Sequence, residues 1–208
     1  MIEVFSLETA HLFGDALPAA YRLRHRIFVE RQKYEVRCWH GLEWDQFDTP
    51  AAVYLLWRDK NGRAGAVARL IPTSQPYMIQ ELWPEMVADG VLPAADDVWE
   101  ITRFGVDRAL DLASRERALG EMLCAFAEFG LERGIRSYLF VTPPQVITVA
   151  FEHAGIPVER LGGERRLGRF PVVAAQAPVT WQALRRLRRH HRVEGSVLRS
   201  AAELPRAA

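Results

Sequence analysis

The chain has 208 residues, a length typical of one domain of ordinary to large size. Hydrophobic residues make up 49% of it and charged residues 25%, which predicts a packed core and excludes a disordered chain. The formal net charge of +1 argues against a protein built around nucleic acid. One segment is an exception, because residues 170–193 contain no acid and include the basic run RRLRRHHR.

The two cysteines, Cys38 and Cys124, stand far apart and form no metal-binding pattern, which is typical of a reducing compartment. The first residues lack the basic start and long apolar run of a signal peptide. No window holds the roughly 18 apolar residues that a membrane-spanning helix needs. We therefore expect a cytoplasmic protein without a membrane span.

The first half of the chain predicts strands, hairpins and one long helix. A strand is expected over residues 2–6, a helix from Asp15 to about Gln32 and irregular structure over 35–50. Two β-rich runs flank DKNGR, whose Asn-Gly pair favours a hairpin. A short helix broken at Pro84 and a strand over residues 97–107 follow.

The second half alternates helices and strands. Helices are expected over residues 114–134 and 143–155 and from Trp181 onward, and strands over 137–142, 157–162 and 169–179. The glycine-rich segment LGGERRLG between the last two strands is interpreted as a turn. This alternation predicts an α/β fold, a mixed sheet covered by helices. We expect a single domain over residues 1–208, with a basic C-terminal helix at about 180–193 and a tail beyond it.

The loop GLEWDQFDT, residues 41–49, places three acids beside two aromatic residues. These residues are Glu43, Asp45 and Asp48 with Trp44 and Phe47. The loop departs from the calcium-binding pattern of EF-hands at its third and sixth positions, so no metal is expected. Motifs for nucleotide triphosphates, dinucleotides, serine hydrolases and zinc proteases are missing from the sequence.

Arg24 and Phe28 lie four residues apart on the first predicted helix and therefore on one face. A buried arginine on that face needs a carboxylate partner, which Asp45 or Asp48 could provide. The alternative is an exposed Arg24 above a core phenylalanine.

Glu100 and Arg103 stand three positions apart in a predicted strand, and an offset of three places side chains on opposite faces. Both can face one pocket only if the strand has a bulge between them. Otherwise one is buried and the other solvated. Arg69, in an otherwise apolar strand, either faces solvent or pairs inward.

These fragments follow one another in a single order: Arg24-xxx-Phe28, Tyr34, Glu43-x-Asp45-xx-Asp48, Arg69 and Glu100-xx-Arg103. That array resembles the acyl-homoserine-lactone synthases, the autoinducer synthases of bacterial quorum sensing. The stretches GLEWDQFD, RLIPT, PYMIQELWP and WEITRFGVD look like hallmarks of the family. The resemblance covers about residues 2 to 180 and is strongest over 22–108. Tyr34 departs from it, because the family usually has tryptophan there.

The resemblance implies a GNAT-like fold, a mixed twisted sheet splayed in its centre and flanked by helices. It implies that an acyl thioester on acyl carrier protein or coenzyme A acylates the amino group of S-adenosylmethionine. Lactone closure then expels methylthioadenosine. No cofactor is expected, because S-adenosylmethionine is a substrate, and no nucleic acid partner is expected. The alternatives are another GNAT N-acyltransferase and, prompted only by RRLRRHHR, a nucleic-acid-binding regulatory module.

The resemblance also implies residue roles. Glu100 would be the catalytic base, with Arg103 beside it. Acids and aromatic rings together suit a sulfonium, an ammonium and an adenine ring. The S-adenosylmethionine pocket is expected to contain Arg24, Phe28, Tyr34, Asp45, Asp48, Arg69 and Arg103. The acyl and pantetheine pocket is expected to contain Ile101, Thr102, Phe104, Thr142, Ile147 and Phe151, with Gly105 permitting close approach of the pantetheine arm.

The thioester carrier is open at this point. Acidic acyl carrier protein would dock on an arginine patch, for which Arg165, Arg166 and Arg169 are candidates. Coenzyme A would place its pyrophosphate at the start of the helix near Ser114, beside Arg115. The charge pattern favours acyl carrier protein.

Overall fold

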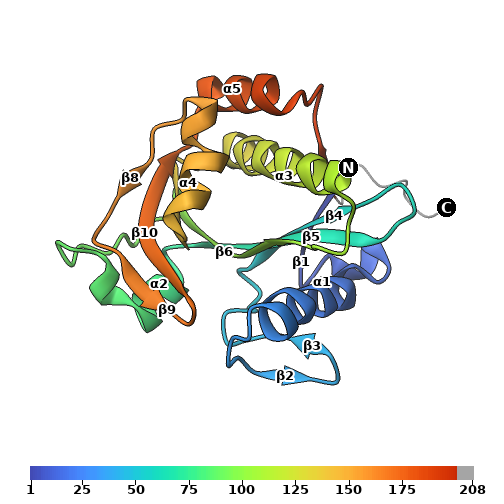
Figure 1. The fold of residues 1–208 in the computed structure, drawn as a ribbon, viewed down its shortest axis with the longest axis horizontal. Helices are drawn as coiled ribbons and strands as arrows, with labels where there is room; N and C mark the ends of the chain where they lie inside the picture. Colours follow the sequence, from blue (N-terminus) through green and yellow to red (C-terminus); the bar gives the residue numbers. More distant parts are fainter. Residues whose placement is uncertain (201–208) are drawn as a thin grey trace.

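A computed structural model describes residues 1–200, in which a nine-stranded mixed sheet carries helices on both faces (Figure 1). The strand order is β11-β1-β4-β5-β6-β7-β10-β8, and β9 pairs with β10. The β1–β11 and β6–β7 pairs are parallel and the other pairs of this sheet are antiparallel. The predicted mixed sheet flanked by helices is therefore confirmed.

The strands are β1 (Ile2–Ser6), β2 (Cys38–Trp39), β3 (Leu42–Glu43), β4 (Val53–Arg58), β5 (Ala64–Pro72), β6 (Val98–Val106), β7 (Ser137–Thr142), β8 (Glu159–Arg160), β9 (Arg165–Leu167), β10 (Phe170–Pro178) and β11 (Leu198–Ser200). The α-helices are α1 (Ala16–Arg24), α2 (Met78–Leu82), α3 (Leu112–Arg133), α4 (Pro144–Ala150) and α5 (Trp181–His191). Three 3-10 turns, η1 (Ala10–Phe13), η3 (Pro84–Met86) and η4 (Glu152–Ala154), and one π-helix, η2 (His25–Arg31), complete the order. No helix in this part of the chain is long and apolar enough to cross a membrane.

The local structure departs from the predictions at several points. The first helix is α1 followed by the π-helix η2, a geometry that is rare and often marks functional sites. The segment interpreted as a turn contains β9, and β11 was not predicted. The long helix α3 begins at Leu112 rather than near Ser114, because the Asp111 carboxylate accepts a hydrogen bond from the Ser114 N–H at 2.9 Å and caps the helix.

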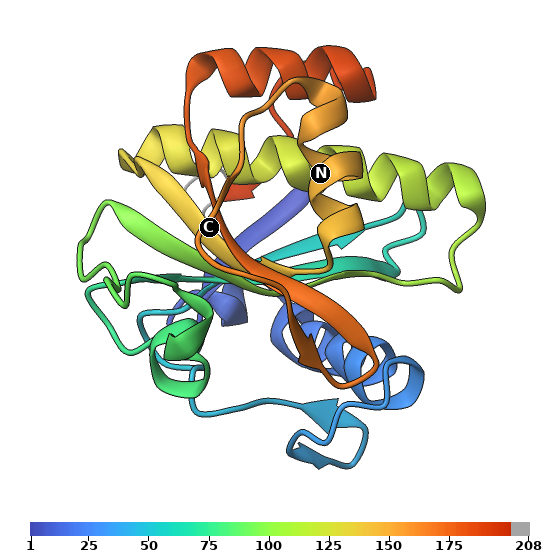
Figure 2. The same ribbon diagram turned by 60° about the vertical axis from the view of Figure 1, so that its left-hand side comes forward.

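The two faces of the sheet build two cores. Helices α3, α4 and α5 cover one face, and α1, with the β2–β3 hairpin beyond it, covers the other (Figures 1 and 2). Successive residues of a strand alternate between the faces. Glu100 therefore points to the α2 side, where Met78 contacts it, and Ile101 points into the core under α3. The catalytic candidates and the apolar core under α3 thus lie on opposite faces of β6.

The sheet is splayed at its centre. Hydrogen-bonded pairing of β6 with β7 begins at Val98 and Ser137 and ends at Ile101 and Phe140, although β6 continues along β5 to Val106. The two strands therefore diverge into a cleft. This arrangement confirms the splayed centre that the resemblance implied.

The C-terminal segments are held to α3 by a buried acid, Glu128, which is 5% exposed. Its carboxylate accepts hydrogen bonds from Arg188 Nη2 at 2.9 Å, Ser196 Oγ at 2.8 Å and Val197 N at 3.0 Å. One side chain thereby joins α5 and the start of β11 to the long helix.

We expect Glu128→Gln to lower the free energy of unfolding by about 1–3 kcal/mol, because Arg188 then lacks a charged partner and one acceptor is lost. Urea denaturation of this variant and of Glu116→Gln, an exposed acid of the same helix, measures the effect. Equal unfolding midpoints for the two variants would contradict the anchoring role.

Candidate functional site

Three arginines and three acids form one buried ion network under the sheet. Each arginine comes from a different element and every acid comes from β3 or the loop that follows it. The members are Arg24 in α1, Arg69 in β5 and Arg103 in β6, with Glu43, Asp45 and Asp48. Their side chains are at most 10% exposed. Buried charges of this kind are tolerated only when they are paired.

Arg24 is fully buried and faces two acids. Its Nε donates to Glu43 Oε2, and its Nη1 and Nη2 donate to the two Asp48 oxygens at 2.7 and 3.0 Å. Burial alone would lower the pKa of Arg24, but the Asp48 and Glu43 carboxylates outweigh it and raise that pKa. The inward pairing of Arg24 is confirmed, and the exposed alternative is wrong.

Asp48 has further partners besides Arg24. Its Oδ1 also accepts a hydrogen bond from the Tyr54 hydroxyl at 2.7 Å and lies 3.0 Å from Arg69 Nη1. Burial raises its pKa, but Arg24 and Arg69 more than offset that effect and hold the pKa of this carboxyl well below its usual range. Asp48 is therefore ionised across the physiological pH range.

Arg69 also pairs inward, which settles the open alternative at that position. Its Nη1 donates to Asp45 Oδ1 at 2.5 Å, its Nε donates to the Thr102 hydroxyl at 3.1 Å, and its guanidinium lies 5.6 Å from the Phe47 ring centroid. Thr102, expected in the acyl pocket, is thus held beside the ion network. Phe47, an aromatic residue of the acidic loop, thus packs against the Arg69 guanidinium.

Arg103 reaches the network because β6 is bulged. Its φ of 51° is left-handed, and the register with β5 shifts between Val67 and Arg69. Its Nε donates to Glu43 Oε1 at 3.0 Å and its Nη2 lies 2.7 Å from Asp45 Oδ2. The predicted bulge is present in β6, but it lies at Arg103 and Phe104, after the regular pairs of Glu100, Ile101 and Thr102 with β5.

Two network residues were missed from sequence. Glu43 bridges Arg24 and Arg103, and Tyr54 donates to Asp48. A charge count contained the signal for Glu43: three inward arginines need three carboxylates, and only two had been assigned. Nothing in the apolar run around Tyr54 distinguishes it.

Glu100 is 1% exposed and lies on the same side of the sheet. Its two carboxylate oxygens accept the backbone N–H groups of Met78 and Ile79, each at 2.8 Å, at the start of α2. Burial raises the pKa of Glu100 to about 7, although these two hydrogen bonds and the nearby arginines partly offset it. A carboxylate has about four acceptor positions. The pair of N–H groups therefore leaves acceptor capacity for a substrate proton.

An aromatic pair borders the network. The rings of Phe28 and Tyr34 stack with centroids 6.2 Å apart, and the Arg103 guanidinium lies 5.6 Å from the Phe28 centroid. Tyr34 also packs against the β9–β10 turn at Gly168. The predicted aromatic residues are thus beside the predicted charges.

Gly105 has a different role from the expected one. A Cβ at this position would lie 2.9 Å from Ile27 Cγ2 and 3.7 Å from Phe28 Cζ. The π-helix η2 therefore occupies the space beside this glycine, and close packing of η2 on β6 explains the residue.

A small apolar cavity lies on the other side of the sheet, between β7, α3 and α5. It has a volume of about 30 Å³, and its lining includes the predicted residues Ile101 and Phe151. Ile147 is fully buried in the same core, Phe104 packs edge-on against Phe126, and Thr142 ends β7. Of the predicted acyl-pocket residues, only Ile101 and Phe151 line this cavity.

The predicted docking arginines lie apart from the ion network. Arg165, Arg166 and Arg169 are exposed on β9 and on the turn between β9 and β10. That turn is the one that touches Tyr34 at Gly168, so this patch is at the rim of the candidate site.

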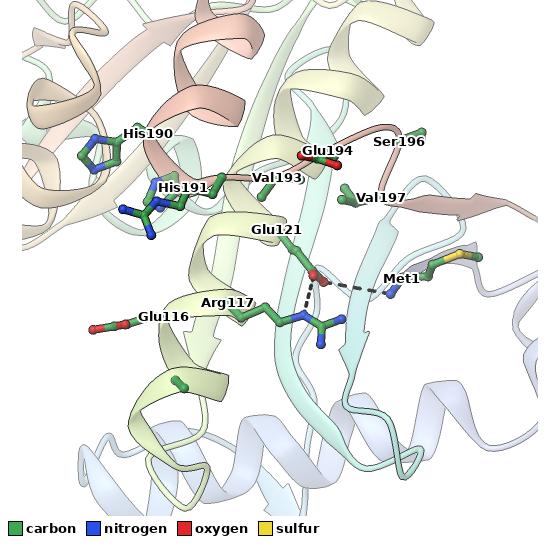
Figure 3. A pocket seen from close by; sticks show the side chains of 12 residues that line it. Met1, Glu116, Arg117, Glu121, His190, His191, Val193, Glu194, Ser196 and Val197 are labelled. Atoms are coloured by element: carbon green, nitrogen blue, oxygen red, sulfur yellow. Dashed lines mark hydrogen bonds and ion pairs between the residues drawn. The ribbon is translucent and has the colours of Figure 1, made fainter.

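A larger cavity of about 690 Å³ lies over the opposite face, between α3, the end of α5 and Met1 (Figure 3). Its acid Glu121 is already engaged by Arg117 at 2.7 Å, the terminal ammonium at 4.0 Å and Trp57 Nε1 at 2.6 Å. The ion network and Glu100 are not in its lining, so it is not the candidate active site. Within residues 1–200, no group of three or more His, Cys, Asp or Glu side chains is placed to hold a metal ion.

Comparison with known proteins identifies the family. The autoinducer synthase family model matches residues 11–187. The acyl-homoserine-lactone synthase of Aeromonas salmonicida is 36% identical over 150 residues, 68% of this chain and 69% of that protein. The isovaleryl-homoserine lactone synthase of Bradyrhizobium diazoefficiens is 34% identical over 164 residues, 78% and 72% of the two chains.

The solved structure of a coenzyme A-dependent acyl-homoserine lactone synthase, BjaI, with S-adenosylmethionine and isopentyl-CoA is also similar. It superposes with a TM-score of 0.86 at 30% identity and covers 96% of this chain and 92% of that one. The splayed mixed sheet is accordingly GNAT-like. The chain belongs to the autoinducer synthase family and is an acyltransferase of the acyl-homoserine-lactone synthase type.

Proposed function

We propose that this protein transfers an acyl group from a coenzyme A thioester to the amino group of S-adenosylmethionine and then closes the homoserine lactone. The observation that carries the proposal is Glu100, a buried carboxyl with a pKa of about 7, between the ion network and the cleft of the sheet. Coenzyme A is favoured as carrier because the similar solved structure is that of a coenzyme A-dependent enzyme with isopentyl-CoA.

The ion network would form one preformed, charged wall of the S-adenosylmethionine pocket. Its three carboxylates and three guanidiniums balance in charge, so the acids position the arginines before substrate arrives. An arginine at the edge, such as Arg103, would bind the substrate carboxylate, and the Phe28–Tyr34 pair would contact the sulfonium and the adenine ring. This assignment supports the roles that the resemblance implied.

Acyl transfer needs a neutral amine. Glu100 would take a proton from the substrate ammonium, and the amine nitrogen would then attack the thioester carbonyl carbon. The β6 backbone beyond Ile101 is unpaired on its β7 side and would supply N–H donors to the developing oxyanion. Collapse of this intermediate releases a second proton from the nitrogen, leaves the amide and breaks the C–S bond, and the sulfur takes the proton held by Glu100 and leaves as the thiol.

Lactone closure would follow in the same site. A carboxylate oxygen of the acylated product attacks the carbon bonded to the sulfonium, a C–O bond forms, and the C–S electron pair goes to sulfur. Neutral methylthioadenosine leaves. No further proton transfer is needed in this step, so the single base is sufficient.

Acyl carrier protein remains a second candidate donor, because Arg165, Arg166 and Arg169 form an exposed cationic patch at the rim of the site. The Asp111 carboxylate already caps α3, which disfavours a pyrophosphate at that helix start. We propose that the three arginines bind the anionic carrier, whichever of the two it is.

Incubation of the protein with S-adenosylmethionine and one acyl chain on either carrier tests the proposal. We expect methylthioadenosine and an acyl-homoserine lactone in equal amounts by mass spectrometry, with the higher kcat/KM for the coenzyme A thioester. Acylation of S-adenosylmethionine without methylthioadenosine release would indicate another N-acyltransferase activity. The absence of product with both carriers would refute the proposal.

The same assay tests the docking patch. The triple variant Arg165→Ala, Arg166→Ala, Arg169→Ala should raise KM for the preferred carrier, with a smaller effect at high salt because exposed charges are screened. Arg133→Ala, an exposed arginine at the end of α3, is the control. An unchanged KM in the triple variant would remove the patch from carrier binding.

A further inference from the structure

The small apolar cavity under α3 reaches Ile101 of β6, the residue next to the proposed base. Ile101, the last β6 residue paired with β7, lines the cavity, and its neighbour Glu100 points to the opposite face. An acyl group whose thioester carbon lies near Glu100 would therefore extend through the cleft into this cavity. This reading rests on the proposed function.

Three phenylalanine rings, Phe126, Phe140 and Phe151, line the cavity, and a fourth, Phe104, packs against Phe126. Phe140 and Phe151 stack with centroids 5.2 Å apart and planes 5° apart, and Phe104 meets Phe126 edge-on at 5.2 Å. The Phe140 ring belongs to β7 and the Phe126 ring to α3, so the cavity is filled from the sheet and from the helix. The free volume that remains is about 30 Å³.

The walls behind the rings are fixed. The Tyr138 hydroxyl donates to the Phe126 carbonyl oxygen at 2.9 Å, and Leu187 of α5 is 3% exposed and lines the far side. A long chain would have to displace packed rings, and protein interiors resist such overpacking.

We infer that the protein prefers short over long acyl chains, and that Phe151 is the residue that limits chain length. Phe151 is the more exposed ring of the stacked Phe140–Phe151 pair, because Phe140 is buried and Phe151 is only half-buried. It ends α4, a helix of only seven residues, so its removal opens the cavity at little cost to the sheet.

The chain-length profile of the unmodified protein is the first test. Butanoyl, hexanoyl, octanoyl and dodecanoyl thioesters on the active carrier are compared by methylthioadenosine release. We expect kcat/KM for hexanoyl to exceed that for dodecanoyl by at least about tenfold, because single methylenes already change specificity by 10-fold or more. Equal or better use of dodecanoyl would overturn the inference. Failure with every thioester would instead refute the proposed function.

The second test is Phe151→Ala. It should raise the dodecanoyl-to-hexanoyl ratio of kcat/KM by at least about tenfold. Val149→Ala is the matched control, because Val149 is in the same helix but is 51% exposed. Phe151→Leu retains more volume and should give an intermediate ratio if the alanine variant does not fold. An unchanged ratio in a folded Phe151 variant would show that this ring does not limit the chain.

Discussion

Glu100→Gln is expected to lower kcat/KM roughly 10²- to 10⁴-fold, because the amide cannot accept the proton of the substrate ammonium. The side chain keeps its shape, so the loss reports basicity. One of the two backbone N–H groups of Met78 and Ile79 would face the new NH2 group, and the start of α2 would lose one acceptor.

The pH dependence separates basicity from that structural loss. Only ionised Glu100 acts as a base, and burial raises its pKa to about 7. The kcat/KM of the unmodified protein should therefore rise with pH through about 7 and level off above it. In Glu100→Gln this rising limb should disappear, whereas damage to α2 would lower the whole profile and leave its shape.

Glu81→Gln is the control for this measurement, because Glu81 is an exposed acid of the same helix. It should retain activity and the pH profile of the unmodified protein. If Glu100→Gln works within threefold of that protein at pH 7, Glu100 is not the base.

Local patterns were enough to predict most of the sheet. The β-rich runs of β4 and β5 around Asn61-Gly62 and the strand β6 are where the sequence places them. Patterns failed where the structure depends on distant partners. The strand β11 exists because it pairs in parallel with β1 and because Glu128 holds the preceding residues, and neither contact is visible in three strand residues.

The π-helix η2 illustrates the same limit. Its sequence HRIFVER reads as an ordinary helix, and only its packing on Gly105 of β6 distinguishes it. The glycine was noticed from sequence and assigned to substrate approach, but Ile27 fills that space. The sequence therefore indicated that some group lies close to Gly105, but not that this group is Ile27.

The sequence predicted that buried arginines would pair with acids, but not which arginine would contact which acid. An arginine on an apolar face needs an acid, so the inward pairing of Arg24 followed from the cost of an unpaired buried charge. Which acid it meets depends on the path of the loop after β2. That path brings Glu43 between Arg24 and Arg103, a bridge that no spacing rule indicates.

The Arg24–Asp48 pair carries the second large prediction. Removal of one partner of a buried ion pair typically costs about 3–5 kcal/mol, because the remaining charge is stranded. We expect Arg24→Ala and Asp48→Ala each to abolish measurable binding of S-adenosylmethionine in calorimetry and to lower the free energy of unfolding by several kcal/mol.

Unfolding of the double variant measures whether the two residues act as one unit. Its loss of unfolding free energy should be smaller than the sum of the single losses, by about 0.5 to 3 kcal/mol, because the second substitution removes a charge already unpaired. The control cycle is Arg136–Asp97, an ion pair of 3.1 Å whose side chains are 63% and 49% exposed. Exposed pairs contribute about 0–1 kcal/mol, so this cycle should be nearly additive. Strict additivity in the Arg24–Asp48 cycle as well would mean that the two buried charges do not support each other, and the ion network would then not be the preformed wall that substrate binding requires.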